Sequence, residues 1–164
     1  LDRNWHPERW QTIFHESYMR TAGNDPIFWG TVAGNMFDFG SVRQAHIDGS
    51  TINDHGLVSY DRSIKKDAFY IYKAAWNRHE PFVHIAEKRL RERENCEQTI
   101  RVYSNQQQLE LIVNGTSRGI MEATDGIFIW DKVQLTSGKN QIEAVAPNTP
   151  YCDRATIIVG KTLK

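Results

Sequence analysis

The hydrophobic pattern of this chain changes character once, at the polar stretch formed by residues 77–81. Before this stretch, apolar residues recur at the three- and four-residue spacing of amphipathic helices. After it, they alternate in short runs that turn residues separate. One uniform helical bundle or one uniform sheet cannot satisfy both patterns. We therefore expect an α+β fold with two domains, residues 1–80 and residues 81–164.

The second half predicts six short strands and the turns between them. The strands are expected at residues 82–85, 100–103, 109–113, 127–133, 141–145 and 155–159, with turns at Asn114-Gly115 and at residues 138–140. Near-regular spacing of this kind is typical of an immunoglobulin-like antiparallel β-sandwich. The expected core residues are Val102, Leu111, Val113, Phe128, Trp130, Leu135, Ile142 and Val145. Phe128 and Trp130 also have the spacing of a sugar-binding platform, but the core explains them better.

Two amphipathic helices are expected in the first half. Residues 1–23 contain one helix that starts near Pro7, and its apolar stripe consists of Trp10, Ile13, Phe14, Ser17, Tyr18 and Thr21. His15 and Glu16 lie in this helix and are best explained as a surface pair. The other helix is expected at residues 63–76. Its apolar face consists of Ala68, Ile71, Tyr72, Ala75 and Trp76, and its solvent-facing side carries Lys65, Lys66 and Lys73.

Between these helices, residues 27–39 form an apolar run without alternation, which predicts a strand that is buried on both faces. Asp38 lies near the end of this strand, and the polar loop of residues 40–56 follows it. Two roles for Asp38 remain open on the residues alone. Its carboxylate either belongs to a functional face at the strand's end or ties the loop down by accepting backbone N–H groups.

Loop residues His46, Asp48 and His55 are of types that bind metals, but their spacing matches no compact metal motif. We expect them to be solvated loop residues and expect no metal site. Cys96 and Cys152 are too few for a disulfide framework, and free thiols are the favoured interpretation over one disulfide.

The charge balance excludes two classes of partner. The chain has 20 basic and 20 acidic residues, so it lacks the basic excess that binding to nucleic acid or to an acidic membrane surface usually requires. No apolar run reaches the ~18 residues of a membrane span, and the first residues do not resemble a signal peptide. The chain begins without Met, as a fragment would.

Three linked motifs resemble a known enzyme family. The runs GTVAGNMFDF (residues 30–39), NDHGLVSYDR (residues 53–62) and KKDAFYIYKA (residues 65–74) are similar to the last strand, last loop and last helix of the catalytic β/α (TIM) barrel in the β-galactosidases of glycoside hydrolase family 2. The runs VYSN, LIVNG and LTSGKN after residue 101 resemble the sandwich domain that follows that barrel. The resemblance covers nearly the whole chain and only the C-terminal part of such an enzyme, whose barrel alone needs ~250 residues.

The resemblance implies a substrate-binding role for Asp38, Asn53 and His55. Gly34 stands where the family usually has a Trp that walls the sugar subsite, so a weakened or reshaped subsite is expected. Three alternatives stay open: another aromatic residue replaces the Trp, the site is specialised, or the site is degenerate. In β-glucuronidases of the family an Asn-x-Lys pair binds the substrate carboxylate. This chain has Asn53-x-His55 and lacks that permanent cation, which favours a β-galactoside. A sodium site at Ile52 and His55, present in some members, is not expected because imidazole is a poor ligand for an alkali cation.

Retaining enzymes of this family use two Glu residues on earlier barrel strands, and neither has a counterpart in this chain. We therefore predict that no catalytic residue lies in the chain and that the chain alone is inactive. The expected partners are a carbohydrate substrate and the remainder of the barrel, with no cofactor, nucleic acid or membrane. The sequence leaves the compartment open, and a secreted or periplasmic location is one option for the intact bacterial enzyme. The alternative is a non-catalytic sandwich module for carbohydrate binding or assembly.

Overall fold

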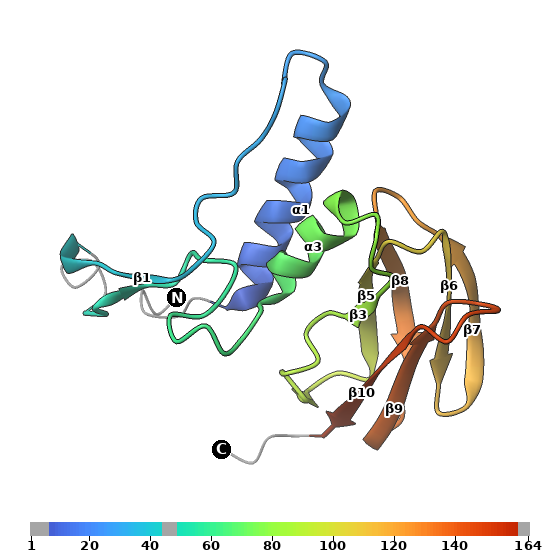
Figure 1. The fold of residues 1–164 in the computed structure, drawn as a ribbon. Coiled ribbons are helices and arrows are strands. Elements are labelled where there is room, and N and C mark those ends of the chain that lie inside the picture. Colours follow the sequence, from blue (N-terminus) through green and yellow to red (C-terminus); the bar gives the residue numbers. More distant parts are fainter. Residues whose placement is uncertain (1–6, 44–48, 161–164) are drawn as a thin grey trace. The chain divides into compact units, whose positions relative to one another are not determined.

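The computed structural model describes residues 7–43 and 49–160 and divides into two compact units, Leu1–Tyr70 and Ile71–Lys164 (Figure 1). Helix α3, Asp67–Trp76, begins in the first unit and ends in the second. The predicted domains, residues 1–80 and residues 81–164, stay a prediction. The two compact units divide ten residues earlier, within α3. Among the described residues, no helix is long and apolar enough to cross a membrane.

Two sheets make up the second unit (Figure 1). One has three strands in the order β3-β5-β8, and the other has five in the order β4-β10-β9-β6-β7. Their bounds are β3 Val83–Ile85, β4 Glu92–Arg93, β5 Glu97–Ser104, β6 Gln108–Val113, β7 Thr116–Glu122, β8 Ile127–Gln134, β9 Gly138–Val145 and β10 Cys152–Val159. Neighbouring strands pair antiparallel, except that β4 pairs with β10 in parallel.

A single apolar cluster joins the two sheets, which is the two-layer arrangement of a sandwich. It contains residues from every strand except the short β4 and the exposed β7, among them Ile85, Val102, Leu111, Phe128, Trp130, Ile142 and Ile157. Phe128 and Trp130 are buried and stacked in this core, with ring centroids 6.1 Å apart. They are therefore core residues and not a sugar platform. The specific immunoglobulin-like connectivity stays a prediction.

All six predicted strands are present within one to three residues of their expected ends. Asn114 and Gly115 have φ values of 51° and 78°, as the predicted type I′ turn requires, and they join β6 to β7. Strand β7 was not predicted because nearly all its side chains are exposed and show no alternation.

Two details of the sandwich prediction are wrong. Residues 138–140 begin β9 instead of forming a turn. Val145 is only half-buried because its neighbours Ala144 and Ala146 face the core from β9 and its end. The other seven predicted core residues are buried.

The end of α3 and the residues after it belong with the sandwich. A Cβ added to Gly126 would lie 2.8 Å from the Cβ of Ala74, so helix and loop approach closely there. The Asn105 amide donates to the carbonyls of Asn77 and Glu80 at 3.0 and 2.9 Å. These contacts fix the stretch that the sequence indicated as a linker.

The first unit contains helix α1, Glu8–Asn24, and the short paired strands β1, Phe39–Gly40, and β2, Ile52–Asn53. The predicted continuous strand at residues 27–39 is wrong for this structure, which has strand pairing only near its end. Trp29 is fully exposed and Val32 is 87% exposed. A strand needs neighbours to satisfy its backbone N–H and C=O groups, and the described part of the chain places none beside residues 27–34.

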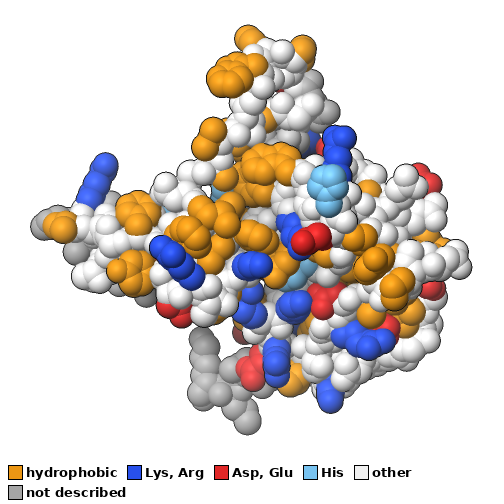
Figure 2. Space-filling view, viewed as in Figure 1, with side chains coloured by type: hydrophobic (Ala, Val, Ile, Leu, Met, Phe, Trp, Pro, Cys, Tyr) orange, Lys and Arg blue, Asp and Glu red, His pale blue; other side chains and the backbone are white. Residues whose placement is uncertain are grey.

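Helix α1 faces opposite to expectation. Its predicted apolar stripe is largely exposed, with Trp10 and Phe14 each 65% exposed, whereas Thr12, His15 and Glu16 are buried. The interpretation of His15 and Glu16 as a surface pair is therefore wrong. Figure 2 shows apolar side chains gathered over parts of the first unit on the face turned to the viewer.

Helix α3 agrees better with its prediction. It begins at Asp67 and not at residue 63, and Ala68, Ile71 and Tyr72 are buried as expected. Trp76 is more than half exposed, although its ring packs against that of Tyr72 with centroids 4.7 Å apart.

Replacement of Leu111 by Ala tests the sandwich core. Leu111 is fully buried between the sheets, so L111A should lower the free energy of unfolding by about 2–5 kcal/mol through lost burial and a cavity. Ile120 lies on neighbouring β7 and is 59% exposed, so I120A should change it by roughly 0.5 kcal/mol or less. Urea unfolding followed by circular dichroism measures both, and equal effects would contradict this core.

Candidate functional site

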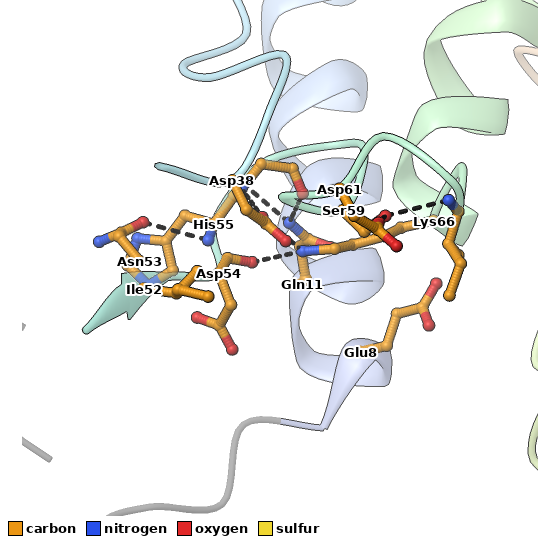
Figure 3. A network of polar contacts seen from close by, with 12 residues as sticks. Glu8, Gln11, Asp38, Ile52, Asn53, Asp54, His55, Ser59, Asp61 and Lys66 are labelled. Atoms are coloured by element: carbon orange, nitrogen blue, oxygen red, sulfur yellow. Dashed lines mark hydrogen bonds and ion pairs between the residues drawn. The ribbon is translucent and has the colours of Figure 1, made fainter. Parts of the chain in front are cut away.

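Asp38 is the centre of a polar network in the first unit (Figure 3). Its carboxylate is buried, and its Oδ1 accepts hydrogen bonds from the Gly56 N–H at 2.9 Å and from the Lys66 ammonium at 2.8 Å. The Asp38 N–H donates to the Val58 carbonyl at 2.9 Å. Asp38 thus makes the loop-tying contacts that the sequence left open as one of its two roles.

The loop returns beside the stretch that precedes β1. Val58 donates to the Met36 carbonyl at 2.9 Å, and Leu57 donates to the Asn35 carbonyl at 3.1 Å. Phe37 and Val58 form a parallel bridge. Residues 35–38 are therefore held by backbone hydrogen bonds, in contrast to the residues before them.

Gly56 is required where the loop crosses this stretch. A Cβ added there would lie 2.1 Å from the Asp38 nitrogen and 2.2 Å from the Phe37 carbonyl carbon. Real Cβ atoms do not approach a backbone so closely, so only glycine fits. This approach brings the Gly56 N–H within reach of the Asp38 carboxylate.

We expected Lys66 on the solvent-facing side of a helix, and this prediction is wrong. Because α3 begins one residue later, Lys66 precedes the helix and its side chain is only 14% exposed. Its ammonium donates to Asp38 at 2.8 Å and to the Asp54 carbonyl at 2.6 Å. The hydrophobic pattern of residues 63–76 does not indicate that the Lys66 side chain points into the protein.

Helix α1 contributes two further contacts that the sequence did not predict. The Gln11 amide donates to the carbonyls of His55 and Gly56, both at 2.9 Å. The Glu8 carboxylate accepts the Asp67 N–H at 2.5 Å, at the start of α3. An acceptor at this end satisfies one of the N–H groups that a helix leaves unpaired.

The structure brings the three predicted substrate-binding residues into one network. The Asn53 Oδ1 accepts the His55 N–H at 3.1 Å, and Gly56, the next residue, donates to Asp38. Asn53 is half-buried and the His55 side chain is exposed. The backbone carbonyls of residues 54–56 accept hydrogen bonds from Lys66 and Gln11 (Figure 3), whereas the His55 side chain is exposed.

Among the described residues of the first unit, Asp61 and His15 have pKa values that differ from their ordinary values. Hydrogen bonds from the hydroxyls of Ser59 and Ser63 lower the pKa of Asp61 to about 2, so Asp61 stays a carboxylate in the turn before Lys66. Burial lowers the pKa of His15 below its ordinary value, because the charged imidazolium loses its hydration there.

The described residues contain no group of three His, Cys, Asp or Glu side chains that could hold a metal ion. His46 and Asp48, which entered the metal hypothesis with His55, lie outside the described residues. Cys96 and Cys152 are exposed free thiols, as predicted.

The chain is similar to bacterial glycoside hydrolases over nearly its full length. It is 44% identical over 155 residues to a β-glucuronidase of Bacteroides fragilis, covering 93% of this chain and 22% of that protein. The solved FMN-binding β-glucuronidase of Facaelibacterium prausnitzii L2-6 is 35% identical, with a TM-score of 0.83 over 97% of this chain and 25% of that one. A solved Bacteroides fragilis protein, named provisionally as a β-galactosidase, is 30% identical with a TM-score of 0.85, over 96% of this chain and 24% of that one.

Residues 97–149 also match a domain family of unknown function, DUF4982. The chain spans only about a quarter of the length of the relatives named above. The resemblance found in the motifs is confirmed, since these relatives are named β-glucuronidase or β-galactosidase.

Replacement of Gly56 by Ala should disrupt the network. The added methyl group meets backbone atoms that cannot move away, so G56A should lower the stability of the first unit by about 1–3 kcal/mol. Gly40 is a matched control because a Cβ there meets nothing within 4 Å. Hydrogen exchange of the Val58 amide reports on the loop. Equal protection of that amide in G56A and G40A would show that the close approach is unimportant.

The buried His15 should make stability depend on pH. Its pKa is lower in the folded than in the unfolded protein, so the unfolded state binds more protons as pH falls below about 6.5. The free energy of unfolding should therefore decrease from pH 7.5 to pH 5.5, and His15→Gln should remove this contribution. An NMR titration of the His15 ring that gave a pKa of 6.5 or more would contradict the prediction.

Proposed function

We propose that this chain forms the C-terminal part of a retaining glycoside hydrolase of family 2. In this proposal the first unit ends the catalytic β/α barrel and the second unit is the sandwich that follows it. Similarity over more than nine-tenths of the chain to bacterial enzymes of this kind carries the proposal. The three motifs at residues 30–39, 53–62 and 65–74 are the parts of the sequence in which the resemblance to this family is most specific.

The exposed apolar surface of the first unit supports a missing neighbour. Trp10, Phe14, Trp29 and Val32 are all more than 60% exposed, and soluble monomers rarely present so many large apolar side chains together. The earlier strands and helices of a barrel would pair with residues 27–36 and cover α1. The remainder of the barrel is thus the proposed partner.

The bound sugar would contact the segment that Asp38 and its neighbours hold. Asn53 and His55 are the proposed hydrogen-bonding residues, because an amide and an imidazole recognise sugar hydroxyl groups directly. Asp38 would act through the segment, since its carboxylate already accepts from Gly56 and Lys66. The two catalytic carboxylates would come from the preceding part of the barrel and act about 5–5.5 Å apart with retention of configuration.

The names of the relatives support two candidate substrate classes, and we propose a terminal β-galactoside as the first. His55 does not supply the permanent charge with which lysine would bind a glucuronide carboxylate. A β-glucuronide is the second candidate, because the 44% identical relative is named a β-glucuronidase.

The non-catalytic alternative, a sandwich for carbohydrate binding or assembly, stays our second candidate. A sugar platform made of Phe128 and Trp130 does not support it, because both rings lie inside the core. The proposal of no cofactor stays a prediction. Because one relative is named FMN-binding, an absorbance spectrum of the purified intact protein is its direct test.

The chain alone and the intact protein should differ in activity. We expect the intact protein to hydrolyse a chromogenic β-galactoside with retention of anomeric configuration, and this chain to show no turnover above a blank. Turnover by the chain alone, or an intact protein that cleaves neither a β-galactoside nor a β-glucuronide, would overturn the proposed function.

Exchange of His55 for Lys should move the substrate preference. In the intact protein, H55K should raise kcat/KM for a chromogenic β-glucuronide, relative to the β-galactoside, by about tenfold, the low end of a charge-assisted hydrogen bond. His79 is also an exposed histidine, in the stretch after α3, so H79K is the matched control. An unchanged ratio in H55K would remove His55 from the sugar site.

A further inference from the structure

The four successive backbone carbonyls of residues 54–57 accept hydrogen bonds from Gln11 and Lys66. The Lys66 ammonium donates to Asp54 at 2.6 Å, and the Gln11 amide donates to His55 and Gly56, both at 2.9 Å. The Lys66 N–H donates to Leu57 at 2.9 Å. Lys66 therefore contacts both ends of this row, with its side chain at one end and its backbone at the other.

The Lys66 ammonium also neutralises the carboxylate that anchors the loop. The side chains of Lys66 and Asp38 are 14% and 7% exposed, so both charges depend on each other more than on water. An ammonium offers three donors, and Lys66 directs two of them at Asp38 Oδ1 and the Asp54 carbonyl. Without Lys66, Asp38 would hold a buried charge, and among the described residues the Gly56 N–H would be the only donor to its Oδ1.

The orientation of Asn53 and His55 depends on this arrangement. These residues flank Asp54, whose carbonyl Lys66 fixes, and the Asn53 side chain accepts the His55 N–H. A rotation of the peptide after Asp54 would therefore turn His55 and break its hydrogen bond to Asn53.

We propose that Lys66 is a positioning residue for substrate binding. It fixes the segment of residues 53–56 through Asp38 and the Asp54 carbonyl without touching the sugar. This inference rests on the proposed function, because it takes Asn53 and His55 as the residues that meet the substrate.

Hydrogen exchange of the intact protein tests the structural half of the inference. In Lys66→Met, which keeps the length of the side chain and removes its charge, peptides spanning residues 53–58 should exchange at least tenfold faster. Lys73 lies in α3 and forms an ion pair with Glu80 at 3.5 Å, so Lys73→Met removes a lysine charge elsewhere and should leave the exchange of these peptides unchanged. Unchanged exchange in Lys66→Met would overturn the inference.

Steady-state kinetics test the functional half. Lys66→Met should raise KM for the chromogenic β-glycoside about tenfold with a smaller change in kcat, because a displaced segment weakens binding more than chemistry. Gln11→Met removes the donors to His55 and Gly56 and should have the same effect to a lesser degree, which keeps the test valid if Lys66→Met folds poorly. Faster exchange with unchanged KM in both variants would refute the positioning role while the proposed function stands. Inactivity of the wild-type protein would instead refute the proposed function.

Discussion

The first unit depends on the contact between the Asp38 carboxylate and the backbone of Gly56. A buried carboxylate is stable only with donors around it, and here they are one backbone N–H and one ammonium. The contact requires a residue without a Cβ at position 56. Because residues 35–38 and 57–58 pair around the same point, the loop, the end of the extended stretch and the residue before α3 are held together there.

The second unit could be predicted well because its own strands supply the whole apolar core that they pack against. Alternation identified six strands, since each buries one face in a core that the chain itself supplies. The hairpin could be predicted from Asn114-Gly115, because its turn needs positive φ at both residues and these two residue types tolerate it. Strand β7 escaped because a strand that is exposed along nearly its whole length leaves no apolar pattern to detect.

The first unit could be predicted only in part, because a pattern shows which side of an element is apolar but not what covers it. Trp10 and Phe14 form the apolar stripe that was expected on α1, yet they lie in solvent. Residues 27–39 have the composition of a buried strand, yet within the described part of the chain only residues 35–39 have backbone partners of the kind a strand needs. Asp38 was found through its place at the end of this run. Lys66 and Gln11 were missed because their contacts cross 12 to 45 residues and follow no spacing rule.

These departures have one explanation in our account, which is that the first unit belongs to a larger barrel. Hydroxyl-radical footprinting of Trp29 tests this most directly, because its side chain is fully exposed in this chain. The measurement compares the oxidation rate of Trp29 in the isolated chain with that in the intact protein. Our account predicts a rate at least several-fold lower in the intact protein, as the neighbouring strands cover residues 27–36. Equal rates in the two proteins would contradict it.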